Sequence, residues 1–212
     1  MTEPLDAQPV GAFLDALASS APTPGGGSVA ALSGAMAAGL VSMVCALTVG
    51  KKQFAEIEEE VRAIHDRAET LRRELQALAE QDIEVFARLA AAYKLPRTTQ
   101  ADAASRQAAI QQVTRLAAEV PLRTAQAAAA LLPLCTALAP RVGRLIVSDI
   151  GVAALLARAT VQSAILNVEI NLAGLEDQIY VRQTRARIED LMVGLSEETD
   201  GVVEIVRGRL NQ

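Results

Sequence analysis

The stretch PTPGGGSVAALSGAMAAGLVSMVCALTVG, residues 22–50, decides the fold of this protein, because it leads from a glycine-rich loop into a long run without charge. Small residues recur along the run at every fourth position, at Ala30, Gly34, Ala38, Ser42 and Ala46. Such a stripe lets another helix pack closely against it. The sequence therefore predicts a buried central helix that starts after an N-cap at Ser28 and continues to Gly50.

The charge-free run is also long enough to span a bilayer, so a membrane helix is the alternative interpretation. Ala, Gly, Ser and Thr dominate the run, and these residues gain little free energy on transfer into lipid. The first residues show no basic segment followed by an apolar one, which is the pattern of a secretory signal. We expect a cytoplasmic protein without a membrane partner.

A charged segment follows, in which apolar residues alternate spacings of three and four from Phe54 to Tyr93. It predicts one helix of about 40 residues, roughly 60 Å long, that ends at Leu95-Pro96. No segment shows convincing β alternation, and the Ala-rich, aromatic-poor composition favours helices. We expect an all-α fold in a single domain over residues 1–212, an elongated up-and-down bundle packed as a homodimer.

Shorter patterns place the remaining helices. Helical spacing predicts a short amphipathic helix over residues 10–18, and Thr98-Thr99 offers caps for a helix that Pro121 kinks or restarts. Ser148-Asp149 is expected to cap a mostly buried helix over residues 150–172. Two amphipathic helices then close the chain.

Charge and cysteine content narrow the class of function. A formal net charge of -5 without any block of basic residues argues against a nucleic-acid partner. Cys45 and Cys135 lie in apolar runs without CxxC spacing, so we expect buried thiols in a reducing compartment. His65 is the single histidine and falls beside the apolar stripe, so it is expected at a helix boundary or in solvent. These residues predict no metal site.

The glycine loop is a candidate binding site. Three glycines let a ligand approach the backbone closely, and the N–H groups and positive dipole end of the following helix suit an anionic or carbonyl-bearing ligand. The loop is no nucleotide-binding P-loop, because the GK[ST] sequence is missing. The alternative is a tight connection between packed helices.

Asp82 is the best catalytic candidate. It lies four residues after Leu78, where the stripe of the long helix calls for an apolar residue. A carboxylate there is desolvated or faces a cavity, and it can then serve as acid, base or stabiliser of a cation. The alternative is that Ile83 fills the core and Asp82 lies at the helix edge, since helix phase drifts over such a length.

Four other polar residues have two interpretations each. Lys51 and Lys52 follow the charge-free run, and they either complement a helix C-terminus or bind an anionic ligand tail and assist proton transfer. Asn167 and Asn171 share one helix face, where their amides either hold a heterocycle or form a hydrogen-bond network in the core.

Five segments together resemble one known family: PTPGGGSVAA at 22–31, LTVGKK at 47–52, Asp82 with Phe86, SDIGVA at 148–153, and Asn167-Val168 with Asn171. The sequence is similar over nearly its whole length to the cyclodeaminase/cyclohydrolase family, which includes the cyclodeaminase domain of formiminotransferase-cyclodeaminase and stand-alone bacterial relatives. The resemblance implies an all-helical dimer that acts on tetrahydrofolate without metal or nucleotide, with a catalytic aspartate at Asp82. Some relatives carry a longer Lys/Tyr cluster where this chain has Lys51-Lys52-Gln53-Phe54.

The activity implied by the resemblance is hydrolysis of 5,10-methenyltetrahydrofolate to 10-formyltetrahydrofolate. The alternatives are formiminotetrahydrofolate cyclodeaminase and a catalytically silent folate-binding dimer. Asp82 and Lys51 are the expected catalytic residues. The expected substrate-binding residues are Pro24, Gly25, Gly26, Gly27, Ser28, Lys52, Asp149, Asn167 and Asn171.

Overall fold

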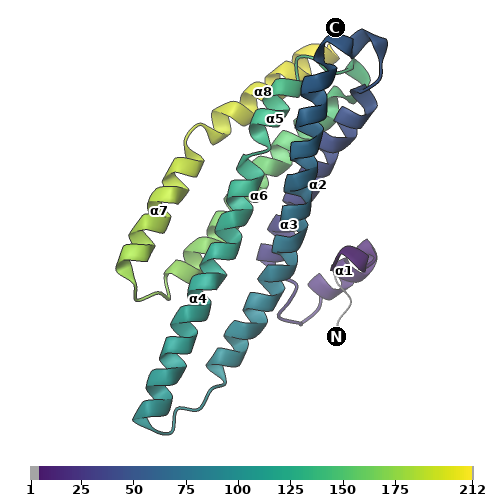
Figure 1. Ribbon diagram of the computed structural model, residues 1–212. Coiled ribbons are helices and arrows are strands. Elements are labelled where there is room, and N and C mark those ends of the chain that lie inside the picture. The colour runs from purple at the N-terminus through teal and green to yellow at the C-terminus, as the bar shows by residue number, and fades with distance from the viewer. Residues whose placement is uncertain (1–4, 212) are drawn as a thin grey trace.

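The computed structural model describes residues 5–211 and shows long helices packed side by side (Figure 1). The helices are η1 (Leu5–Ala7), α1 (Val10–Leu17), α2 (Gly26–Thr48), η2 (Lys52–Ile57), α3 (Glu58–Tyr93), α4 (Gln100–Ala129), α5 (Leu132–Leu138), η3 (Arg144–Ile146), α6 (Val147–Leu172), α7 (Gln178–Met192) and α8 (Leu195–Leu210). No strand occurs within these residues, so the predicted all-α fold is confirmed.

Helix α2 packs against both α3 and α6 (Figure 1), but Met36, Met43 and Leu47 leave one of its faces exposed, so it is only partly the buried central helix that the sequence predicts. Its small-residue stripe is buried except at Ala46. The packing is closest at Gly34, where an added Cβ would lie 3.0 Å from Cγ2 of Thr160 and 3.1 Å from Cδ2 of Leu75. The stripe therefore permits the close approach that its spacing predicts.

Two predicted N-caps are wrong. The N-cap of α2 is Gly25, so Ser28 lies inside the first turn and its hydroxyl is used in a tertiary contact. The N-cap of α6 is Ile146, which places Ser148 and Asp149 inside the first turn of that helix. In both cases a 3-10 turn or an extended glycine starts the helix upstream of the polar residue that resembled a cap.

The long charged helix is shorter than expected, because the chain from Lys52 to Ile57 forms a 3-10 turn before α3 begins at Glu58. Its buried stripe also changes position after Leu78. Val85 and Ala92 are buried in the second half, whereas Phe86 and Tyr93 are 43% and 55% exposed. This drift arises because 3.6 residues per turn does not match the spacing of the stripe over such a length.

Helix α4 runs without interruption through Pro121, so the predicted restart does not occur. It begins with a capping box, in which the Thr99 side chain accepts from the backbone N–H of Asp102 and the Asp102 side chain accepts from the N–H of Thr99. The cap signal read from the sequence is confirmed there.

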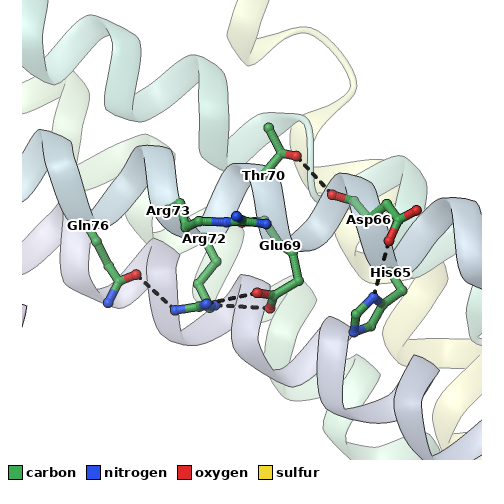
Figure 2. A network of polar contacts seen from close by, with 7 residues as sticks. All are labelled: His65, Asp66, Glu69, Thr70, Arg72, Arg73 and Gln76. Atoms are coloured by element: carbon green, nitrogen blue, oxygen red, sulfur yellow. Dashed lines mark hydrogen bonds and ion pairs between the residues drawn. The ribbon is translucent and has the colours of Figure 1, made fainter.

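Polar contacts link neighbouring turns of α3 on the face that points toward α2 (Figure 2). Arg72 pairs with Glu69 at 2.8 Å and donates to Gln76 at 2.9 Å. Arg72 holds the pKa of the Glu69 carboxyl down at about 2. His65 lies on this face beside Asp66 with its side chain 36% exposed, as the boundary prediction requires.

Two helices, α2 and the segment from Arg144 to Leu172, are long and apolar enough to cross a membrane by length and composition alone. Slightly more than half of the α2 window, 56%, is buried inside the bundle. Cys45 and Cys135 are buried free thiols, and burial raises the pKa of each to about 12. The prediction of core cysteines is thus confirmed.

Candidate active site

A cavity of about 320 Å³ opens where the N-terminus of α2 meets the middle of α3, the middle of α4 and the last turns of α6. It is lined by Pro22, Thr23, Gly25, Gly26, Gly27, Asp82, Val85, Phe86, Leu89, Ala117, Val120, Asn167, Ile170 and Asn171. The glycine loop lines it together with apolar side chains of α3, α4 and α6. Four helices thus build one site.

Asp82 is the one titratable side chain among the described residues that line this cavity. Its Oδ2 accepts a 2.8 Å hydrogen bond from the hydroxyl of Ser28, which is fully buried. Burial raises the pKa of the Asp82 carboxyl, while the Ser28 hydroxyl and backbone N–H act against that rise. The expectation of a desolvated carboxylate at a cavity is confirmed, and Ile83 does not displace it.

The side-chain amide of Asn171 has a fixed orientation. Its Nδ2 donates to the carbonyl oxygens of Asn167 at 2.7 Å and Ala117 at 3.0 Å. The Ala117 carbonyl needs a partner because the residue four positions later is Pro121, which has no N–H to donate. Both amide protons are therefore used within the protein, and Oδ1 is the atom that remains to accept from a ligand.

Asn167 is oriented in a similar way. Its Nδ2 donates to the carbonyl of Ser163 at 2.9 Å, and its Oδ1 lies 3.5 Å from the position that a Cβ of Gly26 would occupy. The asparagines thus combine the two predicted interpretations, because Asn171 joins α6 to α4 and both residues also have an amide oxygen that can accept from a ligand. With Asp82, they offer hydrogen-bond acceptors to whatever fills the cavity.

The family model for Formiminotransferase-cyclodeaminase matches residues 9–190, which includes every lining residue of the cavity. The chain belongs to this family. Its membership confirms the resemblance carried by the glycine loop, Asp82 and the two asparagines.

Individual members of the family are similar over most of this chain. The methenyltetrahydrofolate cyclohydrolase of Methylorubrum extorquens is 40% identical over 199 residues, which cover 94% of this chain and 96% of the relative. The formimidoyltransferase-cyclodeaminase of Rattus norvegicus is 35% identical over 85% of this chain, but the match spans only 34% of that longer protein. The crystal structure of formiminotetrahydrofolate cyclodeaminase from Thermotoga maritima superposes with a TM-score of 0.81, at 29% identity and 97% coverage of each chain.

Three residues that the sequence predicts for the site lie far from the cavity in this protein. Lys51 and Lys52 follow the C-terminus of α2, and a helix of 23 residues separates them from the glycine loop by about 35 Å. Asp149 lies in the first turn of α6, 18 positions before Asn167, which corresponds to about 27 Å. Within this chain these three residues do not reach the cavity, and their roles stay predictions.

Of the loop residues, Gly25, Gly26 and Gly27 line the cavity, whereas Pro24 and Ser28 do not. Pro24 follows a cis peptide bond, and Ser28 contacts the cavity only through its hydrogen bond to Asp82. Sequence reasoning missed the apolar wall of Val85, Leu89, Ala117, Val120 and Ile170. Val85 and Leu89 lie three and seven positions after Asp82, and Ile170 lies three positions after Asn167, so helical spacing could have found them. Nothing in the sequence of α4 marks Ala117 or Val120 as cavity residues.

Proposed function

We propose that this protein is a methenyltetrahydrofolate cyclohydrolase, which hydrolyses 5,10-methenyltetrahydrofolate to 10-formyltetrahydrofolate. The observation that carries the proposal is the single carboxylate of Asp82 in a cavity whose other described lining residues are uncharged. Methenyltetrahydrofolate carries a positive charge spread over its N5–C–N10 amidinium. A carboxylate in a water-poor site attracts such a cation far more strongly than it would in water.

The reaction requires one proton acceptor. Water attacks the methenyl carbon, and Asp82 takes one proton from that water. The adduct then opens as the bond between the carbon and N5 breaks, and N5 gains the remaining hydroxyl proton. The carbon remains on N10 as a formyl group, and one proton is released overall. General base catalysis of this kind contributes about 10²- to 10⁴-fold to the rate. No cofactor beyond the tetrahydrofolate carrier takes part.

The acceptor oxygens of Asn167 and Asn171 match the donor edge of a pterin, which carries N–H and NH₂ groups. The cavity of about 320 Å³ lies at the small end of ligand sites and suits the bicyclic ring and the one-carbon bridge. The aryl and glutamyl parts of the folate then extend beyond it. Backbone N–H groups of the glycine loop are left to contact the ring, as the loop geometry suggests.

The proposed assembly is a homodimer formed through α2 and α6. Large apolar side chains on these helices are exposed along one side of the bundle, namely Met36, Met43, Leu47, Val152, Leu155, Leu166 and Ile170. Residues 29–50 carry no charge, so nothing on α2 opposes burial of this face. Apolar helix faces of this extent are typical of obligate interfaces between copies of a chain.

A two-fold axis across α2 would place Lys51 and Lys52 of one subunit beside the cavity of its partner. The glycine loop and the lysines lie at opposite ends of the same helix, so an antiparallel pairing of two α2 helices brings unlike ends together. Lys51 would then assist proton transfer, and Lys52 would bind the folate carboxylates. Asp149, at the same end of the bundle as the lysines, would approach the site by the same route.

The alternative activity is formiminotetrahydrofolate cyclodeaminase, in which N10 attacks the formimino carbon on N5 and ammonia leaves. The crystal structure from Thermotoga maritima, which carries this name, supports it. The match to the Methylorubrum extorquens protein over nearly the full length of both chains favours the cyclohydrolase. A folate-binding dimer without activity would need the cavity, but it would not need a buried carboxylate in it.

The test is to incubate the purified protein separately with 5,10-methenyltetrahydrofolate and 5-formiminotetrahydrofolate and to follow the methenyl absorbance. Loss of absorbance in the first incubation supports the cyclohydrolase, and its appearance in the second supports the cyclodeaminase. Absence of change in both refutes both enzyme functions. Asp82→Asn serves as the variant control, and turnover within a few fold of wild type would reject Asp82 as the base.

A further inference from the structure

The carboxylate of Asp82 occupies the N-terminal end of α2, although the two residues in contact are 54 positions apart. The N-cap of α2 is Gly25, which has no side chain to accept from the free N–H groups of the first turn. Asp82 provides that acceptor from α3, because the hydroxyl and the backbone N–H of Ser28 both stabilise its ionised form. In many helices the N-cap side chain accepts from the first turn, whereas in α2 the acceptor is Asp82, the proposed catalytic group on α3.

Gly27 makes this contact sterically possible. A Cβ added at Gly27 would overlap with Oδ1 of Asp82 and lie 2.5 Å from its Cγ and 2.8 Å from its Oδ2. The other two glycines of the loop differ, since a Cβ at Gly26 would be 3.5 Å from the nearest atom of Asn167 and one at Gly25 would be 4.0 Å from the Pro22 carbonyl. The third glycine is therefore the position at which the carboxylate excludes every larger residue.

We propose that Gly27 and Ser28 are positioning residues for Asp82: the bare Cα of Gly27 sets how closely the carboxylate approaches the helix end, and the Ser28 hydroxyl fixes its rotation. The proposal rests on the proposed function, because it takes Asp82 as the group that acts on the substrate. Neither residue needs to touch the substrate, and the Ser28 N–H directed at Asp82 is not available to it.

The same contact controls the charge of Asp82. No titratable side chain reaches the cavity from the described lining residues of α2, α4 or α6, which are Gly26, Gly27, Ala117, Val120, Asn167, Ile170 and Asn171. Ser28 and the positive end of the α2 dipole are thus the groups that favour the ionised carboxylate against its burial. Removal of the hydroxyl is expected to raise the pKa of Asp82 further.

The experiment compares Ser28→Ala and Gly27→Ala with two matched controls. Ser33→Ala removes a hydroxyl from the same helix, where it donates to the Val29 carbonyl, and Gly201→Ala adds a Cβ where no atom lies within 4 Å. Ser28→Ala is expected to lower kcat about 10- to 100-fold, as expected for the loss of a hydrogen bond to a charged group, and to change KM much less. Gly27→Ala is expected to lower kcat at least as strongly, and the controls are expected to keep wild-type kinetics.

The pH profile of kcat/KM separates positioning from loss of structure. Its acid limb is expected to move to higher pH in Ser28→Ala, whereas a partly unfolded fraction lowers the whole profile without moving it. A wild-type acid limb and kcat in Ser28→Ala would overturn the proposal.

A second measurement does not depend on activity. Titration of the Asp82 carboxyl carbon by ¹³C NMR is expected to give a higher pKa in Ser28→Ala than in the wild type. An unchanged pKa overturns the positioning role whatever the enzyme acts on. A raised pKa in a protein that turns over neither folate refutes the proposed function and leaves the positioning of Asp82 supported.

Discussion

Lys51 and Asp82, the two residues predicted to carry the proton chemistry, lie at opposite ends of helix α2 within one subunit. Asp82 contacts Ser28 in the first turn of the helix, and Lys51 follows its last residue, Thr48. Two groups about 35 Å apart cannot act on one carbon atom. If both take part in catalysis, they must come from different subunits.

Mixing two inactive variants tests this arrangement. Lys51→Met and Asp82→Asn are each expected to be inactive, and a mixture that exchanges subunits is expected to recover about a quarter of the wild-type activity, because half of the dimers carry one intact site out of two. The measurement is cyclohydrolase activity after exchange, with subunit mixing followed by native mass spectrometry. The control is a mixture of Asp82→Asn with the variant that carries both Lys51→Met and Asp82→Asn, which should restore no activity. A mixed dimer that stays inactive, or a fully active Lys51→Met, contradicts the shared site.

The apolar face of α2 provides a second test. Met43→Glu places a charge in the middle of this face, where Met43 is 40% exposed in the single chain. Burial of an unpaired charge is strongly unfavourable, so we expect a monomer by sedimentation velocity and a loss of most activity. Ile179→Glu on α7 is the matched control, since its 61% exposed side chain belongs to neither α2 nor α6. A dimeric Met43→Glu protein would show that the interface lies elsewhere.

Pro121 is expected to affect substrate binding through Asn171. In the wild type the Ala117 carbonyl accepts from Asn171 at 3.0 Å. In Pro121→Ala the backbone N–H of residue 121 can donate to that carbonyl instead. The amide of Asn171 then loses one of its two fixed contacts. We expect KM to rise about 3- to 10-fold while kcat changes little, since a neutral hydrogen bond contributes about 0.5–1.5 kcal/mol.

The control for this variant is Pro133→Ala in the first turn of α5, where a proline leaves no carbonyl in the cavity wall unpaired. Equal KM values for Pro121→Ala and the wild type would show that Asn171 is held without help from the proline.

The burial of Asp82 predicts a stability that depends on pH. Its pKa is raised in the folded protein, so the carboxyl stabilises the fold below the ordinary aspartate pKa, and this contribution is lost as the pH rises through the folded pKa. Asp82→Asn is neutral at every pH and is therefore expected to gain stability relative to the wild type between about pH 4 and pH 7. Urea unfolding at both pH values measures the difference. A difference that is the same at both values would contradict the raised pKa.

The close packing of α2 can be tested at two glycines of the same helix. Ala at Gly34 would force its Cβ against Thr160 and Leu75, which are both buried, whereas Ala at Gly39 would meet only the flexible Arg72 side chain at 3.9 Å. We expect Gly39→Ala to stabilise the protein by up to about 1 kcal/mol, from helix propensity. Gly34→Ala is expected to be about 1–3 kcal/mol less stable than Gly39→Ala, from overpacking. Chemical denaturation of both variants checks this, and equal stabilities would mean that α6 can move away.

Local pattern was sufficient for most of the fold. The charge-free run, the periodic charged segment and the small-residue stripe predicted the long helices and the close packing of α2, because burial follows from side-chain periodicity. It was insufficient to locate the first residues of α2 and α6, where Ser28 and Ser148-Asp149 were wrongly predicted as N-caps. A serine before an apolar helix resembles a cap in sequence, but a tertiary partner or a preceding 3-10 turn can shift the start by a few residues.

The sequence by itself determined an all-α bundle, its family and the identity of Asp82 as the residue that breaks an apolar stripe. Only the tertiary structure decided which residues share a cavity with Asp82. It brought the glycine loop and both asparagines to that carboxylate and left Lys51, Lys52 and Asp149 at the far end of the bundle. The physical reason is that a helix separates its ends by 1.5 Å per residue, so proximity depends on how antiparallel helices pack, and sequence pattern carries little information on that pairing.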